Sequence, residues 1–419
     1  MSPLSSAHTR RELPLAGVRV LDLSRLLPGP FCSLLLADFG ADVVKVEDLG
    51  AGDYMRWAPP RYAGEEQTAR SGMFVGVNAN KRSIRLNLKA PEGRAALLRL
   101  ASGYDVVLES FRPGVMERLG LGYDQLRAIN ERLVYCAITG YGATGPYRLR
   151  AGHDLNYLAL SGLLGVSGEL DGPPTQSATQ IADIGGGALI GALGILMALR
   201  ERDRSGLGQF VDVAMLDGML AWLPALAAHV FCGERPPRRG EIELGGALLC
   251  YRPYRCADGW ITLASIERKF WEGLVHGVGR PDLLDCQFDR PGSPAHAELE
   301  RIFAGRTRAE WQRFADAHEC CIEPVLELEE ALDSELVRDR EMVVDFEQPG
   351  VGAVKRMGLP FKLSDTPGEP TRAPAPALGA HTAEVLGEAG FSASEIDALM
   401  RVGAAGGPVA DAQGSYLAQ

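Results

Sequence analysis

The chain has 419 residues, of which 46% are hydrophobic and 23% are charged, and its formal net charge is −11. This length suggests two or three domains, each able to bury a core of its own. An acidic chain matches nucleic acid and anionic membrane surfaces poorly, because both reward clustered lysine and arginine. We therefore expect no nucleic acid and no membrane as a partner. A small molecule is still a possible ligand.

The eight cysteines show no spacing typical of a metal site or a disulfide framework. We expect all of them to be reduced thiols, and we expect no metal. The N-terminal segment MSPLSSAHTRRELP lacks the apolar core of a signal peptide. The apolar stretches near 188–199 and 215–230 are interrupted or too short to span a membrane. These features predict a cytoplasmic protein.

Short apolar runs alternate with helical patterns through the first third of the chain. The predicted strands are 18–24, 41–47, 78–89, 104–110 and 132–142, and the predicted helices are 31–40, 91–102 and one within 111–130. This alternation favours an α/β doubly wound domain with a parallel sheet and right-handed crossovers. The first turn has no GxGxxG, which disfavours a dinucleotide dehydrogenase. The segment 50–77, rich in glycine, proline and aromatic residues, is predicted to be irregular.

Ligands of parallel sheets bind at the carboxyl ends of the strands. Several basic residues fall in the segments expected there: Arg112, Arg118, Arg148 and Arg150, with Lys81 nearby. Any one of these arginines can equally be a solvated loop residue. Their convergence on one edge, which follows from the predicted topology, favours a ligand that contains phosphate.

The second half of the chain changes character. Residues 209–226 are predicted to be rich in helix, 251–265 to form a hairpin with its turn at 257–259, and the segment up to 319 to be mostly helical. These patterns predict four parts: a large domain at 1–230, a small α+β domain at 231–335, a return to the large domain at 336–402, and a disordered tail at 403–419.

Two possible proton carriers, His153 and Asp183, each stand where a loop gives way to an apolar helix-like run. His153 is either a hydrogen-bonded structural residue or a neutral imidazole that accepts a proton. Asp183 is either the N-cap of its helix or a carboxylate that acts on a ligand. In the second interpretation, the three glycines at 185–187 let a ligand approach the backbone, and free N–H groups there bind a developing oxyanion.

Glu267 follows a predicted strand in the small domain, in the segment ASIERKF. Taken alone it is an unremarkable surface charge before a helix. It gains interest as a partner of Asp183, because two carboxylates that share a site raise one of the two pKa values.

The chain resembles the class III CoA-transferase and α-methylacyl-CoA racemase family along nearly its whole length. The matching segments are LAGVRVLDLSRLLPGPFCSLLLADFGADVVKVE, NKRSIRLNLK, ESFRPGVMERLGLGYD, GYGATGPYRLRAGHDLNYLALSG, ADIGGGALIGALGILMAL and ALGAHTAEVLGE. The resemblance implies an interlocked homodimer, in which each subunit has a Rossmann-like large domain and a smaller α+β domain. It also implies that coenzyme A is part of the substrate.

The resemblance assigns roles to individual residues. Asp183 matches the family aspartate, which is a nucleophile in transferases and an acid or base in racemases. His153 matches the second base of the racemase pattern GHDxNYLALSG, and Glu267 matches a racemase glutamate. Arg118 matches an arginine that contacts CoA. Three further positions line the site of relatives: Tyr141, Asp154 and Tyr157. Asp48 stands where relatives carry an arginine.

Three hypotheses follow. The first is an acyl-CoA racemase or epimerase that inverts an α-carbon through an enolate, with no metal or redox cofactor. The second is a CoA-transferase that forms an aspartyl-CoA thioester on Asp183. The third is a catalytically idle partner protein that binds a nucleotide. Neither the acyl group nor a pathway follows from the residues.

Overall fold

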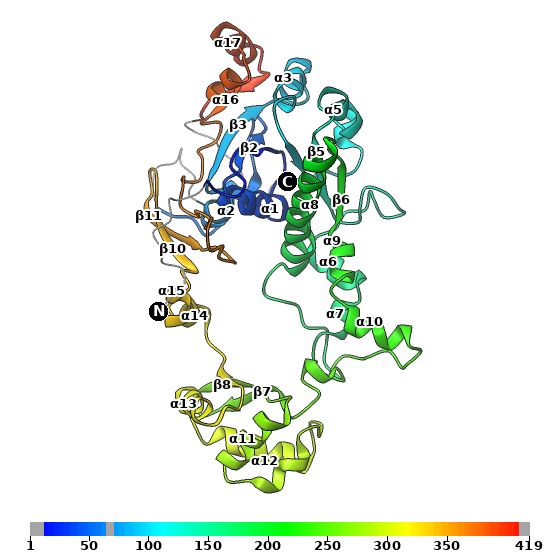
Figure 1. The fold of residues 1–419 in the computed structure, drawn as a ribbon, viewed down its shortest axis with the longest axis vertical. Helices are drawn as coiled ribbons and strands as arrows, with labels where there is room; N and C mark the ends of the chain where they lie inside the picture. Colours follow the sequence, from blue (N-terminus) through cyan, green and yellow to red (C-terminus); the bar gives the residue numbers. More distant parts are fainter. Residues whose placement is uncertain (1–11, 64–70, 410–419) are drawn as a thin grey trace. The chain divides into compact units, whose positions relative to one another are not determined.

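The computed structural model describes residues 12–63 and 71–409. The chain divides into two compact units (Figure 1). The larger unit comprises Met1–Ser161, Thr179–Trp222 and Glu335–Gln419, and the smaller one comprises Gly162–Ala178 and Leu223–Ser334. Residues 162–178 thus belong to the smaller unit, although they fall inside the range predicted for the large domain.

A seven-stranded sheet with the order β12-β3-β2-β1-β4-β5-β6 forms the centre of the larger unit. Its strands are β1 (Arg19–Asp22), β2 (Asp42–Glu47), β3 (Lys81–Leu86), β4 (Val106–Glu109), β5 (Val134–Thr139), β6 (Phe210–Ala214) and β12 (Ala405–Gly406). The pairs formed among β1 to β6 are all parallel. Their order, 3-2-1-4-5-6, is that of Rossmann-type sheets. The predicted α/β class with a parallel sheet is confirmed.

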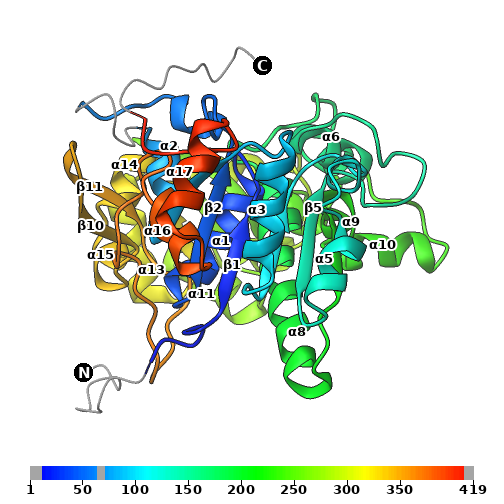
Figure 2. The ribbon, with the colours of Figure 1, turned by 90° about the horizontal axis from the view of Figure 1, so that it is seen from above.

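Helices cover both faces of this sheet, as a parallel sheet requires. On one face, buried side chains of the strands pack with α3 (Pro91–Ala101), α5 (Tyr123–Ile129), α16 (Thr382–Glu388) and α17 (Ala393–Arg401). Figure 2 shows α3, α16 and α17 together on one side of β1 and β2. On the other face lie α1 (Pro28–Asp38) and α8 (Ile190–Ser205), where α8 approaches the sheet closely at Gly191 beside Ile138 and Cys32.

Three predictions about this unit are wrong. Residues 210–214, predicted within a helix-rich segment, form β6, which pairs with β5 at the edge of the sheet. The segment 50–77 includes the short helices η1 (Tyr54–Trp57) and α2 (Gly72–Asn78). In the predicted tail, β12 pairs antiparallel with β3, because Asn87 binds the backbone of Gly403 and Ala404 and brings the chain alongside. Residues 410–419 lie outside the described residues.

The smaller unit contains the antiparallel sheet β7-β8-β9. Its strands are β7 (Tyr251–Cys256), β8 (Gly259–Ala264) and β9 (Ile322–Pro324), and the helices beside them are α11 (Arg268–Gly277), α12 (Pro294–Ala304) and α13 (Arg308–His318). The predicted hairpin with its turn at 257–259 is confirmed, since Cys256 pairs with Gly259. The core of this unit is aromatic, with Trp271, Phe303 and Trp311 completely buried.

The remaining elements are distributed over both units. In the larger unit they are α4 (Val115–Arg118), α6 (Asp154–Leu160), η2 (Ala182–Leu189), α9 (Met215–Leu220), α15 (Glu335–Asp339), β10 (Val343–Gln348) and β11 (Gly352–Met357). In the smaller unit they are α7 (Leu163–Val166), α10 (Pro224–Phe231), η3 (Glu243–Gly245), η4 (Pro281–Cys286) and α14 (Leu328–Leu332).

One helix in the described part of the chain, Ala182–Ser205, is long and apolar enough to cross a membrane by length and composition. The apolar stretch near 188–199 is part of this longer helix, because the π-helix η2 runs directly into α8 and gives 24 continuous residues. Of its most apolar window, 56% is buried inside the protein. Core helices of soluble proteins pass the same test, so we draw no membrane role from it.

Candidate active site

Asp183 lies in the first turn of η2, a π-helix that leads into α8. The N-cap of η2 is Ile181, so the interpretation of Asp183 as an N-cap is wrong. Its carboxylate is therefore not used to cap its own helix. Asp183 is partly buried and remains available for chemistry.

A second aspartate from a distant segment caps η2 instead. Asp154, the first residue of α6, accepts hydrogen bonds through Oδ1 from the backbone N–H groups of Ala182 at 2.6 Å and Asp183 at 3.1 Å. His153 is the N-cap of α6 and is exposed. The Oδ1 atom of Asn156 accepts a hydrogen bond from the backbone N–H of His153 at 3.0 Å, which fixes this turn. Asp154 thus joins the two predicted proton carriers, His153 and Asp183, at one place in the fold.

The neighbourhood of Asp183 disfavours its charged form. Burial raises the pKa of Asp183, and the negative charge of Asp154 raises it further, to about 7. A neighbouring carboxylate was predicted to raise the pKa of Asp183, and one does. That carboxylate belongs to Asp154 of the same unit. At neutral pH, Asp183 is able either to donate or to accept a proton.

Two tyrosines pack beside this junction. The rings of Tyr141 and Tyr157 meet edge to face, with centroids 5.2 Å apart. Two glycines make room for them, because a Cβ at Gly140 would lie 2.5 Å from Oη of Tyr157 and a Cβ at Gly152 would lie 2.6 Å from Oη of Tyr141. Burial raises the pKa of Tyr157, and the charge of Asp183 raises it further. Tyr157 therefore stays a neutral hydroxyl beside Asp183.

The interpretation of the three glycines as a ligand approach is wrong. Gly185, Gly186 and Gly187 are buried against protein: a Cβ at Gly185 would lie 2.4 Å from the ring of Trp222, and one at Gly186 would lie 2.6 Å from the carbonyl oxygen of Met215. The glycines let α9 pack directly on η2. The predicted oxyanion donors are also occupied, since the N–H groups of Ala182 and Asp183 bind Asp154, and that of Ile184 binds the carbonyl oxygen of Gln180.

The predicted phosphate-binding arginines lie near the carboxyl ends of β4 and β5, with Arg118 at the end of the short helix α4 and the other three in loops. Arg112, Arg118, Arg148 and Arg150 are exposed. The guanidinium of Arg150 lies over the ring of Tyr147 at 4.4 Å. In the described residues, the guanidinium groups of the other three have no hydrogen bond or ion pair, so they are free to bind an anion.

The predicted place of Lys81 is wrong. Lys81 begins β3, at the amino end of that strand, and its side chain is completely buried. Its ammonium group donates to the carbonyl oxygen of Pro30 at 2.8 Å and to Oδ1 of Asn78 at 2.9 Å, and it lies 3.5 Å from Asp22. A buried ammonium needs such partners, and they leave Lys81 no access to a phosphate.

A buried cluster of charges supports the carboxyl ends of β1 and β2, and we did not predict it. Lys45 forms an ion pair with Asp53 at 2.8 Å, and Arg56 binds both carboxylate oxygens of Glu47, at 2.6 and 2.8 Å. Asp22 accepts hydrogen bonds from two serine hydroxyl groups. The signal was present in the strands LDLS and VKVE, where charged residues interrupt apolar runs.

Glu267 lies in the smaller unit, as the exposed N-cap of α11 after β8. The predicted surface position before a helix is thus confirmed. Its predicted partnership with Asp183 stays a prediction, and the raised pKa of Asp183 arises without it.

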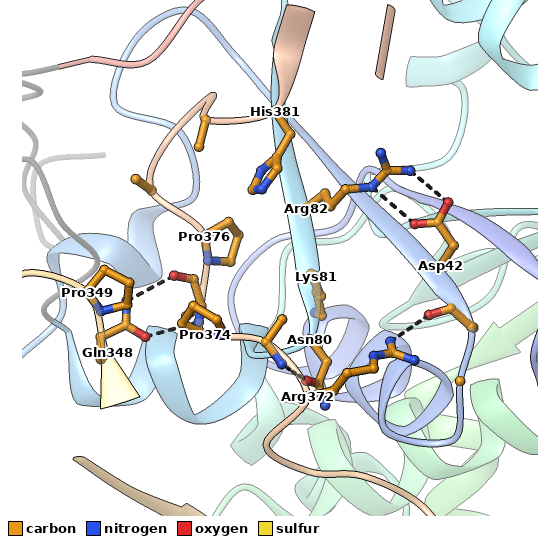
Figure 3. A pocket seen from close by; sticks show the side chains of 16 residues that line it. Asp42, Asn80, Lys81, Arg82, Gln348, Pro349, Arg372, Pro374, Pro376 and His381 are labelled. Atoms are coloured by element: carbon orange, nitrogen blue, oxygen red, sulfur yellow. Dashed lines mark hydrogen bonds and ion pairs between the residues drawn. The ribbon is translucent and has the colours of Figure 1, made fainter. Parts of the chain in front are cut away.

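A cavity of about 520 Å³ opens at the amino ends of β2 and β3 (Figure 3). Asn80 and Gln348 hold its proline-rich wall, because their carboxamides bind the backbone of Ala373 and Ala375. Arg82 in this cavity is already bound by three carboxylates, those of Asp42, Glu384 and Glu388. The cavity contains none of the predicted proton carriers.

Comparisons with known proteins agree with this arrangement. The model of CoA-transferase family III matches residues 15–382. The chain is 40% identical to α-methylacyl-CoA racemase of Mus musculus over 389 residues, which covers 91% of this chain and 95% of that protein. It is 37% identical to succinyl-CoA:mesaconate CoA-transferase of Haloarcula hispanica, over 90% of this chain and 96% of that protein.

Solved structures show the same fold. The crystal structure of a CaiB/BaiF family protein from Brucella suis superposes with a TM-score of 0.80 at 30% identity, covering 90% of this chain and 100% of that one. Family model, relatives and structure agree over nearly the whole length. The chain belongs to CoA-transferase family III and is a CoA-thioester enzyme.

Proposed function

We propose that the enzyme is an acyl-CoA racemase or epimerase that inverts the α-carbon of a 2-methylacyl-CoA-like thioester by removing a proton from one face and returning a proton to the other. The observation that carries this proposal is the junction at Asp154, which joins the turn of His153 to Asp183 and raises the pKa of Asp183 to about 7. A group with a pKa near 7 can act as an acid or as a base at neutral pH, which a reversible inversion requires.

His153 and Asp183 carry the proton transfers in this proposal. One of them removes the proton from the α-carbon, and the electron pair of that C–H bond moves into the thioester carbonyl to give an enolate. The conjugate acid on the opposite face then returns a proton to the α-carbon. Proton and charge balance are restored when the two groups exchange protons with water. Tyr141, Asp154 and Tyr157 line the site in this proposal, and the role of Glu267 rests on the sequence resemblance.

The CoA part of the substrate binds along the loops after β4 and β5. Arg112 and Arg118 supply cations for its phosphates, in line with their exposure and lack of internal partners. CoA is thus part of the substrate, and the reaction uses no metal or redox cofactor.

The enzyme functions as an interlocked homodimer in the cytoplasm. An apolar stripe supports the dimer: Leu189, Leu193, Leu196 and Met197 project from one continuous helix and are 42 to 62% exposed. Contiguous apolar surface of this kind marks a protein interface. A monomer in sedimentation experiments at micromolar concentration would contradict this part of the proposal.

The test is α-proton exchange. The protein is incubated in D2O with (R)-2-methylacyl-CoA and no acceptor acid, and mass and optical purity are followed together. We expect deuterium gain with loss of optical purity. His153→Gln should abolish inversion, whereas His229→Gln, which changes an exposed histidine of the smaller unit, should leave it intact. Full inversion by the His153 variant would overturn the two-base proposal.

The second candidate is a CoA-transferase. The partly buried Asp183 supports it too, because that route needs this carboxylate alone, as a nucleophile for a thioester carbonyl. In the same D2O experiment a transferase would show no exchange. A mass increase of one CoA on the peptide that contains Asp183, seen with wild type and absent in Asp183→Asn, would favour transfer over inversion.

A further inference from the structure

Glu109 ends β4 and is a buried carboxyl group without a cation. Only 6% of its surface is exposed. Its side chain accepts a hydrogen bond from the backbone N–H of Phe111 at 2.6 Å and one from the hydroxyl of Tyr135 at 3.4 Å. Neither partner is charged, and the described residues supply no ion pair for it. A buried carboxylate in this state is costly, so the neutral acid is the stable form.

Glu109 holds the start of the loop that contains the proposed phosphate-binding arginines. Phe111, which it binds, directly precedes Arg112, and α4 with Arg118 follows. The loop has a second attachment nearby, where Oγ of Ser110 accepts a hydrogen bond from the backbone N–H of Arg25. The position of Arg112 thus depends on a hydrogen bond to a group that can gain or lose a proton.

We propose that Glu109 is a positioning residue that tunes CoA binding by its protonation: through Phe111 it holds the loop before Arg112 and Arg118 in both forms, and only the ionised form adds a negative charge behind these arginines. This inference rests on the proposed binding of the CoA phosphates by that loop. The substrate affinity of the enzyme therefore falls in alkaline solution, although the phosphates themselves are fully charged there. No second protein or effector is needed.

The groups that face Glu109 shift its pKa in both directions, and burial is the largest cause. Burial raises the pKa of Glu109, the N–H of Phe111 lowers it, the charge of Glu117 on α4 raises it and the Tyr135 hydroxyl lowers it, for a net value of about 8. A further titratable neighbour is Cys136 on β5, which is buried and whose own pKa is raised by burial. Glu109 is thus neutral below pH 8 and becomes charged above it. Bound phosphate would shift this transition to still higher pH, by linkage.

The experiment measures the Kd of acetyl-CoA by calorimetry between pH 7.0 and 9.5. Acetyl-CoA has no titrating thiol, and its phosphomonoester, with a second pKa of about 6, is already mostly ionised at pH 7.0. We expect the Kd of wild type to rise about three- to tenfold across the range, the size expected for one added charge near a phosphate in a partly solvated site. Glu109→Gln, which keeps an acceptor for Phe111 and cannot ionise, should bind tightly with a flat profile.

Two further variants sharpen the test. Glu117→Gln removes a neighbouring negative charge and should move the midpoint to lower pH, while Tyr135→Phe removes a hydrogen bond to the carboxylate and should move it to higher pH. The Tyr135 variant remains informative if the Glu109 variant does not fold. A flat wild-type profile, or an unchanged rise in Glu109→Gln, would overturn the inference. Absence of acetyl-CoA binding at every pH would instead overturn the proposed function, and this inference with it.

Discussion

Buried acids occur in two regions of the larger unit, and the two regions treat them in opposite ways. At the carboxyl ends of β1 and β2, burial would raise the pKa of Glu47, but Arg56 and Lys45 outweigh it and lower the pKa to about 2. At the carboxyl end of β4 and in the first turn of η2, Glu109 and Asp183 have no cation, and their pKa values are raised, chiefly by burial, to about 8 and about 7. The difference lies in the presence of a paired cation, because burial raises the pKa of all three residues.

This difference in pKa distinguishes carboxyl groups that stabilise the fold from those that can transfer protons. A carboxylate with a pKa near 2 keeps its charge at any physiological pH, so Glu47 can stabilise the fold but cannot transfer protons. A carboxyl group with a pKa near 7 changes its state readily, which is costly for stability and useful for catalysis. The comparison therefore predicts that substitutions in the two regions have different consequences.

Asp183→Asn should give the largest effect. The amide has the same shape but neither accepts nor donates the proton, so we expect α-proton exchange to fall by at least about 1,000-fold. The thermal midpoint should not fall, because the substitution removes a buried group that has no cation to stabilise its charge. Exchange rates in D2O and thermal unfolding are measured on the same sample. Retained exchange would mean that Asp183 is not a proton carrier.

Glu47→Gln should affect stability instead of catalytic chemistry. It leaves Arg56, which is only 7% exposed, without its carboxylate partner, and breaking a buried ion pair in this way costs about 3–5 kcal/mol. The matched control is Glu109→Gln, where no cation loses a partner and the free energy of unfolding should change by less than about 1 kcal/mol. Urea titrations of both variants give the comparison, and equal losses would contradict it.

Protonation of Glu47 should destabilise the protein in acid. Glu47 has a lowered pKa of about 2 against an ordinary value of 4.5, so the unfolded chain binds this proton more readily. The stability from this group, about 3 kcal/mol, is fully present above pH 5 and is lost as the pH falls toward 2. Free energies of unfolding measured between pH 6 and 3 should therefore decline less steeply in Glu47→Gln than in wild type.

Local patterns predicted much of this fold, and contacts across long sequence distances account for the failures. The strands β1 to β5 and the hairpin of β7 and β8 follow from apolar periodicity and turn residues, which neighbouring positions determine. By contrast, β12 has only two residues, and its pairing joins Ala405 to Leu86. The strand β6 is followed immediately by α9. The sequence pattern therefore predicts helix across both elements.

In the candidate site, too, contacts between residues far apart in the sequence could not be predicted. His153 and Asp183 were found because each stands at the start of an apolar run, and the family pattern marks both. That Asp154 caps η2 could not be predicted from local pattern, because the two residues joined, Asp154 and Asp183, are 29 positions apart. The glycines at 185–187 were misinterpreted for a related reason: their role depends on α9, which follows them in the chain and packs against them.

Asp154→Asn should give the smallest and most specific effect. The Oδ1 atom of the amide can still accept the hydrogen bonds from Ala182 and Asp183, so η2 should keep its place, while the negative charge beside Asp183 disappears. The pKa of Asp183 should then fall, but remain above its ordinary value because burial, the larger cause, is unchanged. A base must be ionised to act, so the acid limb of kcat/KM for α-proton exchange should move about one pH unit lower, from a wild-type midpoint near 7. An unchanged midpoint would show that Asp154 acts on Asp183 through geometry alone, and that burial is enough to keep a carboxyl group without a cation in the range where it exchanges protons.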